Sequence, residues 1–136
     1  MKHGRGYVYD IYYHIVWCVK YRREILVGNI KDDFIDIITN ICINNNYEIV
    51  EINTDKDHVH MLLGLSPQDS IPVVMKTLKG VSARLLNQKH SAEISKALYG
   101  GPIWSPSYYI ATTSDNVMDN IKAYIKNQGN EDLKKG

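Results

Sequence analysis

The chain has 136 residues, of which 44% are hydrophobic and 23% are charged, and its formal net charge is +1. This composition is typical of one folded domain with a buried core, and it excludes a disordered or fibrous chain. No long apolar run follows Met1, and Cys18 and Cys42 lie in apolar patterns typical of reduced, buried thiols, so we expect a cytoplasmic protein without a signal peptide or membrane span.

Charge is segregated along the chain. Residues 1–31 carry a net charge of +4, residues 32–57 carry −6, and residues 76–96 carry +4 again. A basic segment attracts a polyanion within a Debye length of about 10 Å, whatever the total charge of the protein. Taken alone, however, the charges slightly favour the alternative that these segments are ordinary solvated faces.

The first half of the chain alternates between strand and helix patterns. Residues 7–21 are rich in aromatic and β-branched side chains, which predicts a long strand. Residues 32–45 place apolar side chains at helical spacing, which predicts a helix. Residues 47–53 and 58–65 are predicted as two further strands, and the short polar turn between them predicts a hairpin.

The second half of the chain contains two predicted helices and one predicted strand. Ser70 is expected to cap a helix that has Pro72 in its first turn, where a missing amide hydrogen does no harm. Opposite the apolar stripe of this helix lie three basic side chains, Lys76, Lys79 and Arg84. Residues 103–113 are predicted as a strand, and Ser114 or Asp115 is expected to cap the last helix.

The order of these elements predicts the architecture. No internal repeat, low-complexity run or linker divides the chain. The order is that of an α+β, ferredoxin-like β-α-β-β-α-β antiparallel sheet with an added C-terminal helix. Helices on one face of such a sheet leave the other face free for a ligand or a second subunit.

Two histidines one residue apart begin the predicted strand 58–65. Because side chains alternate faces along a strand, His58 and His60 point to one side of the sheet while Val59 points into the core. Neutral imidazole is a common ligand of divalent cations, so this pair is half of a metal site. An isolated His-x-His pair also arises often by chance. A zinc hydrolase is weakly supported, because Met61 and Leu62 stand where Asp-His usually follows.

The last predicted helix carries candidate partners for the histidine pair. Tyr124 and Gln128 are four residues apart, so they lie one above the other on a single helix face. Alone, Tyr124 is interpreted as a half-buried tyrosine beside the apolar stripe, and Gln128 as a surface residue. The combination of His-x-His on a strand with a tyrosine and an amide on a terminal helix favours a functional interpretation.

This combination, together with its flanking residues, resembles the HUH-type single-tyrosine transposases, which move insertion sequences as single-stranded DNA. Five segments carry the resemblance, in the family's order: an opening strand, the strand with the two histidines, a central helix, the entry to the fourth strand, and the nucleophile helix. They are residues 13–26, 57–63, 78–84, 104–109 and 121–128. The resemblance therefore covers nearly the whole chain.

The resemblance implies a reaction and a set of site residues. Tyr124 is the implied nucleophile, which forms a 5′-phosphotyrosine intermediate as single-stranded DNA is cleaved and rejoined at insertion-sequence ends. His58, His60 and Gln128 are the implied ligands of Mg²⁺ or Mn²⁺. Residues 1–136 are expected to form a single transposase domain, with a core at 7–113, a linker at 114–116 and the nucleophile helix at 117–130. For Asp57, an exposed turn residue is the main interpretation and an orienting group for an imidazole the alternative.

The resemblance also implies partners. Single-stranded DNA with hairpin ends is the expected substrate, and the weakly assigned DNA-binding residues are Lys20, Arg22, Arg23, Lys79 and Arg84. A homodimer is expected, and the alternatives of active sites shared between subunits and of sites within one chain stay open. The chain departs from the family pattern at residues 111–116, which lack the glycine that family linkers commonly carry.

Three alternatives remain open from the sequence. The chain resembles, in the same residues, the related tyrosine transposases that act on scattered palindromic repeats. A second alternative is a non-catalytic, nucleic-acid-binding ferredoxin-like module, which would have no use for the combination of His58, His60, Tyr124 and Gln128. A metal-dependent hydrolase needs the histidines but neither Tyr124 nor a covalent adduct.

Overall fold

The computed structural model describes residues 1–135, with side chains through residue 128. An N-terminal hairpin pairs β1 (Lys2–Gly4) with β2 (Tyr7–Tyr9). The remaining elements follow in the order β3 (Tyr12–Cys18), the 3-10 helix η1 (Lys20–Arg22), α1 (Gly28–Asn45), β4 (Glu48–Thr54), β5 (His58–Gly64), α2 (Ile71–Leu98), β6 (Tyr109–Thr112) and α3 (Val117–Lys135). No helix in this part of the chain is long and apolar enough to cross a membrane.

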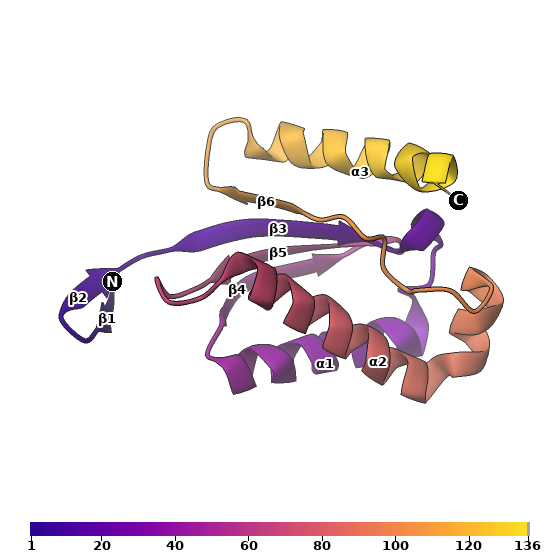
Figure 1. Cartoon of the computed structure of the whole chain (residues 1–136), viewed down its shortest axis with the longest axis horizontal. Coiled ribbons are helices and arrows are strands. Elements are labelled where there is room, and N and C mark those ends of the chain that lie inside the picture. Colours follow the sequence, from indigo (N-terminus) through magenta and orange to yellow (C-terminus); the bar gives the residue numbers. More distant parts are fainter. Residues whose placement is uncertain (136) are drawn as a thin grey trace.

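The four strands β3 to β6 form one antiparallel sheet in the order β4-β5-β3-β6 (Figure 1). After the N-terminal hairpin, the chain therefore follows the β-α-β-β-α-β order with an added C-terminal helix. This arrangement confirms the ferredoxin-like fold predicted from the sequence. The two central strands, β3 and β5, place the histidine motif in the middle of the sheet.

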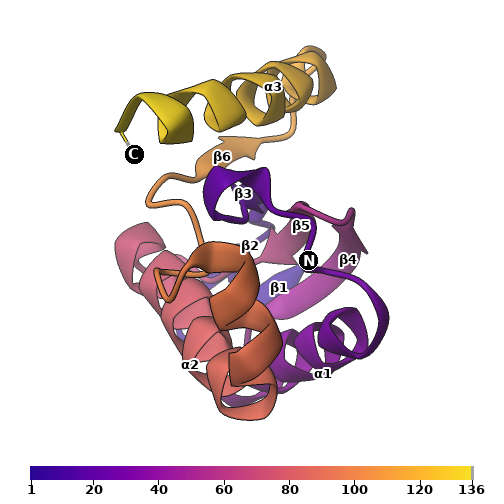
Figure 2. The same cartoon turned by 90° about the vertical axis from the view of Figure 1, so that its right-hand side faces the viewer.

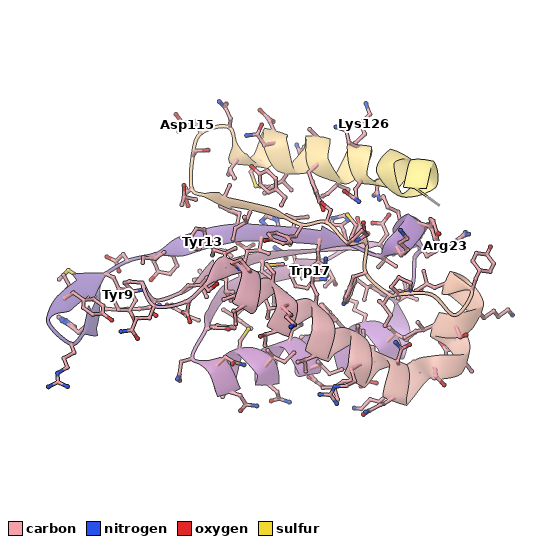
Figure 3. All side chains as sticks on the ribbon, in the orientation of Figure 1. Tyr9, Tyr13, Trp17, Arg23, Asp115 and Lys126 are labelled. Carbon is pink, nitrogen blue, oxygen red and sulfur yellow. The ribbon has the colours of Figure 1, made fainter. Side chains whose placement is uncertain are left out.

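The helices α1 and α2 cover one face of the sheet, and the main core lies between these helices and the sheet. Along β5, Val59, Met61 and Leu63 are fully buried and alternate with side chains that point to the opposite face. Trp17 on β3 points into the same core, where it packs edge to face against Phe34 and Trp104 (Figure 3). The strict alternation on β5 fixes the direction of its two histidines, because a slip of one residue would bury them in this core.

The opposite face of the sheet is partly covered by α3 (Figure 2). Val16 on β3 and Val117 and Ile121 on α3 form a second buried apolar cluster, with Tyr109 and Tyr124 against its edge. The sequence predicted that this face would be free for a ligand or a second subunit. In the structure, the chain's own last helix occupies the part of the face above β3 and β6.

Several predicted boundaries differ from the structure. Residues 7–21 do not form one strand, because the chain leaves the N-terminal hairpin at Asp10, pairs again from Tyr12 and then turns into η1. The first helix begins at Gly28, four residues before the prediction, and Ser70 makes no side-chain cap to α2. The predicted strand 103–113 shrinks to β6, since before it only an isolated bridge joins Trp104 to Val19. The division into core, linker and nucleophile helix stays a prediction, with α3 starting at Val117.

Candidate active site

His58 and His60 lie side by side on the face of the sheet that carries α3. Both side chains are half-buried, while Val59 between them is fully buried in the core. In the antiparallel register, His60 is opposite Val16, a residue of the apolar cluster under α3. The histidine pair therefore sits next to the seat of the last helix, as the alternation of β5 predicted.

The ring of His58 is oriented by its neighbour in sequence. Its Nδ1 lies 2.8 Å from Oδ1 of Asp57, whose side chain is only 17% exposed. Asp57 is therefore not the exposed turn residue that was the main interpretation, and the alternative of an orienting carboxylate describes it better. With Nδ1 bound to the carboxylate, the ring presents Nε2 as the nitrogen for a ligand.

His60 has a third histidine as its partner. Nε2 of His60 lies 3.0 Å from Nδ1 of His14 on the neighbouring strand β3. Burial, followed by the charge of His14, lowers the pKa of His60 below its usual value of 6.5. A neutral ring keeps a lone pair for a cation at pH 7. His14 was not among the predicted site residues, although alternation along β3 places it on the same face as Val16.

Tyr124 and Gln128 are held by the loop that precedes β6. The Tyr124 hydroxyl donates to Oγ of Ser107 at 3.0 Å, and Nε2 of Gln128 donates to Oγ of Ser105 at 2.5 Å. Gln128 is 5% exposed, so it is not the surface residue that its position taken alone suggested. Because the two residues are one turn apart on α3, two serines separated by one proline hold them both.

The loop is in turn fixed by a lysine of α2. The ammonium of Lys79 donates to the carbonyl oxygens of Ser105 and Ser107, at 2.8 and 3.0 Å. Ser105 itself is fully buried, next to Trp104, whose indole N–H donates to Ser82 on α2. Lys79 was predicted to contact DNA; the structure shows it bound to the loop that seats Tyr124 and Gln128.

The other predicted DNA-binding residues differ in their surroundings. Arg84 is exposed on α2, and Arg23 is exposed beside Tyr99, to whose hydroxyl it donates. Lys20 lies 5.0 Å from the centre of the Tyr21 ring. Arg22 is engaged within the protein, with Asp57 and with the backbone of α3. Arg23 lies at the end of the sheet where η1 contacts α3 (Figure 3).

The structure therefore brings the two predicted halves of the site to one face of the sheet. The histidines stand on β5, and Tyr124 and Gln128 stand on a helix packed over the adjacent strand β3. Among side chains through residue 128, no three or more of His, Cys, Asp and Glu are grouped to hold a metal. A cation on the two histidines therefore needs an amide, water or phosphate oxygen as a further ligand, a donor set that Gln128 fits and that suits Mg²⁺ or Mn²⁺.

Known transposases are similar to this chain in sequence. The family model described as IS200-like transposase matches residues 7–128. The ISDra2 transposase TnpA of Deinococcus radiodurans is 44% identical over 128 residues, which cover 94% of this chain and 91% of that protein. The transposase for insertion sequence element IS200 of Salmonella typhimurium is 33% identical over 120 residues, 88% of this chain and 78% of the relative.

Solved structures show the same fold. A crystal structure described as a transposase from Deinococcus radiodurans R1 superposes with a TM-score of 0.89 at 41% identity, covering 94% of this chain and 98% of the other. A REP-associated tyrosine transposase, solved bound to a REP hairpin, superposes with a TM-score of 0.55 at 16% identity, covering 93% and 73%. The second likeness is one of fold alone.

Proposed function

The chain belongs to the family of IS200-like transposases, and we propose on this premise that it cleaves and rejoins single-stranded DNA at insertion-sequence ends through a 5′-phosphotyrosine intermediate. The observation that carries the proposal is the position of Tyr124 on a helix that packs over β3, the strand next to the one with His58 and His60. The identities of 44% and 33% to insertion-sequence transposases favour this substrate over scattered palindromic repeats. Because the substrate is DNA, the proposal includes the cytoplasmic location expected from the sequence.

Tyr124 is the proposed nucleophile. Its oxygen attacks the phosphorus of the scissile phosphodiester, the bond from phosphorus to the 3′ oxygen breaks, and the leaving 3′ oxygen takes up a proton. The new bond joins the 5′ phosphate to the tyrosine and preserves the energy of the broken bond, so a later 3′ hydroxyl can reverse the step on a new partner. A tyrosine with an ordinary pKa of about 10 is a weak nucleophile at neutral pH, so the reaction needs help at the phosphate.

A divalent cation is the proposed source of that help. His58, His60 and Gln128 would hold Mg²⁺ or Mn²⁺, which withdraws charge from the phosphate and orients it for attack when bound. Asp57 fixes the ring of His58 with Nε2 presented. The lowered pKa of His60 keeps its ring neutral, as a ligand requires. Gln128 donates its amide nitrogen to Ser105, and its amide oxygen is the type of ligand that a hard cation prefers.

A metal-dependent covalent adduct is the test of this proposal. Purified protein is incubated with labelled single-stranded DNA from both sides of its own gene, with Mg²⁺, with Mn²⁺ and with chelator, and run on a denaturing gel. We expect a shifted protein–DNA band with either metal and none with chelator. Tight DNA binding without an adduct under all conditions would instead support the non-catalytic binding module.

Hairpin DNA is the proposed form of the substrate. The REP-associated relative of the same fold was solved with a hairpin, and this chain offers the mixture of cations and apolar surface that such DNA requires. Lys20, Asn87, Trp104 and Pro106 are among the residues that line a hollow of about 450 Å³ beside the loop before β6. Arg23 and Arg84 remain the outward-facing candidates for phosphate contacts.

We expect Lys79 and Arg84 to respond differently when they are replaced. Lys79→Met removes the ammonium that binds the carbonyls of Ser105 and Ser107, so adduct formation should fall about 10-fold or more through misplacement of Tyr124 and Gln128. The slope of log affinity against log salt should not change. Arg84→Ala should flatten that slope by about one unit, as for the loss of one phosphate contact.

Lys76→Met is the matched control, because Lys76 is exposed on the same helix and is expected to change neither quantity. Hairpin affinity is measured by fluorescence anisotropy across a salt series, and adduct yield by denaturing gel. A flatter slope for Lys79→Met would support the sequence prediction that Lys79 contacts DNA.

A homodimer is part of the proposal, and mixing two inactive variants tests whether its active sites are shared between subunits. Mixing Tyr124→Phe protein with His58→Ala protein should restore part of the adduct formation if the tyrosine of one subunit acts with the histidines of another. Each variant alone should be inactive. The mixture is prepared by co-expression with two different tags, so that mixed dimers are verified by tandem purification. No restored activity in verified mixed dimers would place the whole site within one chain, the arrangement in which α3 packs on its own sheet.

A further inference from the structure

Arg22 connects the two halves of the active site. One guanidinium nitrogen, Nη2, lies 2.9 Å from Oδ2 of Asp57, and the other, Nη1, donates to the backbone carbonyl of Ile125 at 3.1 Å. Asp57 precedes His58 and holds its ring, while Ile125 follows Tyr124 on α3. A single side chain therefore contacts both the residue that orients the ring of His58 and the helix that carries Tyr124.

The backbone around Arg22 is held in an unusual conformation. Tyr21 and Arg22 have φ values of 55° and 50°, so two successive residues other than glycine lie in the left-handed region. Side chains disfavour this region, and such residues persist only where the surrounding structure holds them in place. Here the turn directs Arg22 into the space between β5 and α3 instead of outward to solvent, as its two internal partners show.

The side chain is also partly buried. Arg22 is 29% exposed and Asp57 is 17% exposed, and Nε of Arg22 is buried without a hydrogen-bond partner among the described residues. Partial burial strengthens an ion pair relative to one at the open surface. The planar guanidinium reaches two acceptors in different directions at once, which the single ammonium of a lysine does less well.

We propose that Arg22 is a positioning residue that sets the nucleophile helix against the histidine motif, an inference that rests on the proposed function. Through Asp57 it fixes the ring of His58, and through the carbonyl of Ile125 it fixes the turn of α3 between Tyr124 and Gln128. This role differs from the contact with DNA phosphate predicted from the sequence.

The test compares Arg22→Ala, Arg22→Lys and the control Arg23→Ala in the full chain without DNA. Arg23 is the next residue and carries the same charge, but it is exposed and donates to Tyr99 instead. Mn²⁺ affinity is measured by electron paramagnetic resonance, and the placement of α3 by amide hydrogen exchange over residues 118–128. Thermal unfolding verifies that each variant is folded.

For both Arg22 variants we expect Mn²⁺ affinity to fall about 10-fold or more, the usual loss when the group that orients a ligand is disturbed. Exchange in α3 should accelerate, and Arg23→Ala should match the wild type in both measurements. In an Asp57→Asn background, Arg22→Ala should cause no further loss of Mn²⁺ affinity, because its effect on the metal passes through Asp57.

Two results would overturn the inference. One is unchanged Mn²⁺ affinity and unchanged α3 exchange in a folded Arg22→Ala variant, even if that variant binds DNA more weakly. The other is an undiminished effect of Arg22→Ala on Mn²⁺ affinity in the Asp57→Asn background. Wild-type protein that binds no Mn²⁺ would contradict the proposed metal site instead, and α3 exchange would then decide the role of Arg22 by itself.

Discussion

Replacement of Tyr124 by phenylalanine is expected to abolish the covalent adduct and strand cleavage while leaving DNA binding intact. The substitution removes one oxygen, the proposed nucleophile, so the adduct should fall by at least about 10³-fold, the scale seen when a covalent nucleophile is lost. The ring should stay in place, because it packs 5.9 Å from the ring of Tyr109 at the edge of a buried apolar cluster. The measurement is the denaturing gel with Mg²⁺ or Mn²⁺.

The structural cost of this substitution should be small. The Tyr124 hydroxyl donates a hydrogen bond to Ser107, and a bond of this kind contributes about 1 kcal/mol to stability. Tyr109→Phe is the matched control, since Tyr109 lies on β6 in contact with Tyr124 and should form the adduct normally. An undiminished adduct in Tyr124→Phe would assign the nucleophile to another residue. Metal-dependent cleavage without any adduct in the wild type would favour the hydrolase alternative.

Local periodicity predicted the centre of the fold well. Alternation along β5 requires only neighbouring residues, and it correctly placed Val59 in the core and the two histidines on the opposite face. The same alternation failed for residues 7–21, where aromatic and β-branched side chains continue across several elements. No glycine in the sequence marks the turn at Tyr21 and Arg22. Contacts with distant residues hold its left-handed conformation, and a local pattern does not reveal such contacts.

The residues of the candidate site could be selected from the sequence, but the contacts that these residues make could not. Tyr124 and Gln128 could be paired from their spacing on one helix, yet the burial of Gln128 depends on Ser105, which is 23 residues away in sequence. His14 meets His60 across 46 residues, and Arg22 meets Ile125 across 103. Contacts of this kind follow from the order of strands in the sheet and from the position of α3 on it. Neither the strand order nor the position of α3 follows from a local sequence pattern.

Replacement of both histidines is the second change with a large expected effect. In His58→Ala/His60→Ala, we expect Mn²⁺ binding to be lost and the adduct to fall below detection, because these rings supply the proposed nitrogen ligands. The fold should survive, since both side chains point away from the core that Val59, Met61 and Leu63 form. Mn²⁺ binding is measured by electron paramagnetic resonance, and folding by circular dichroism.

Two control variants make this result specific. His3 is exposed in the N-terminal hairpin, so His3→Ala should bind Mn²⁺ as the wild type does. His14→Ala removes the partner of His60 but neither proposed ligand, and it should weaken Mn²⁺ binding by a smaller factor than the double substitution. Equal losses in His14→Ala and the double variant would make His14 as important to the cation as the histidine pair. Unchanged Mn²⁺ affinity in the double variant would contradict the proposed metal site.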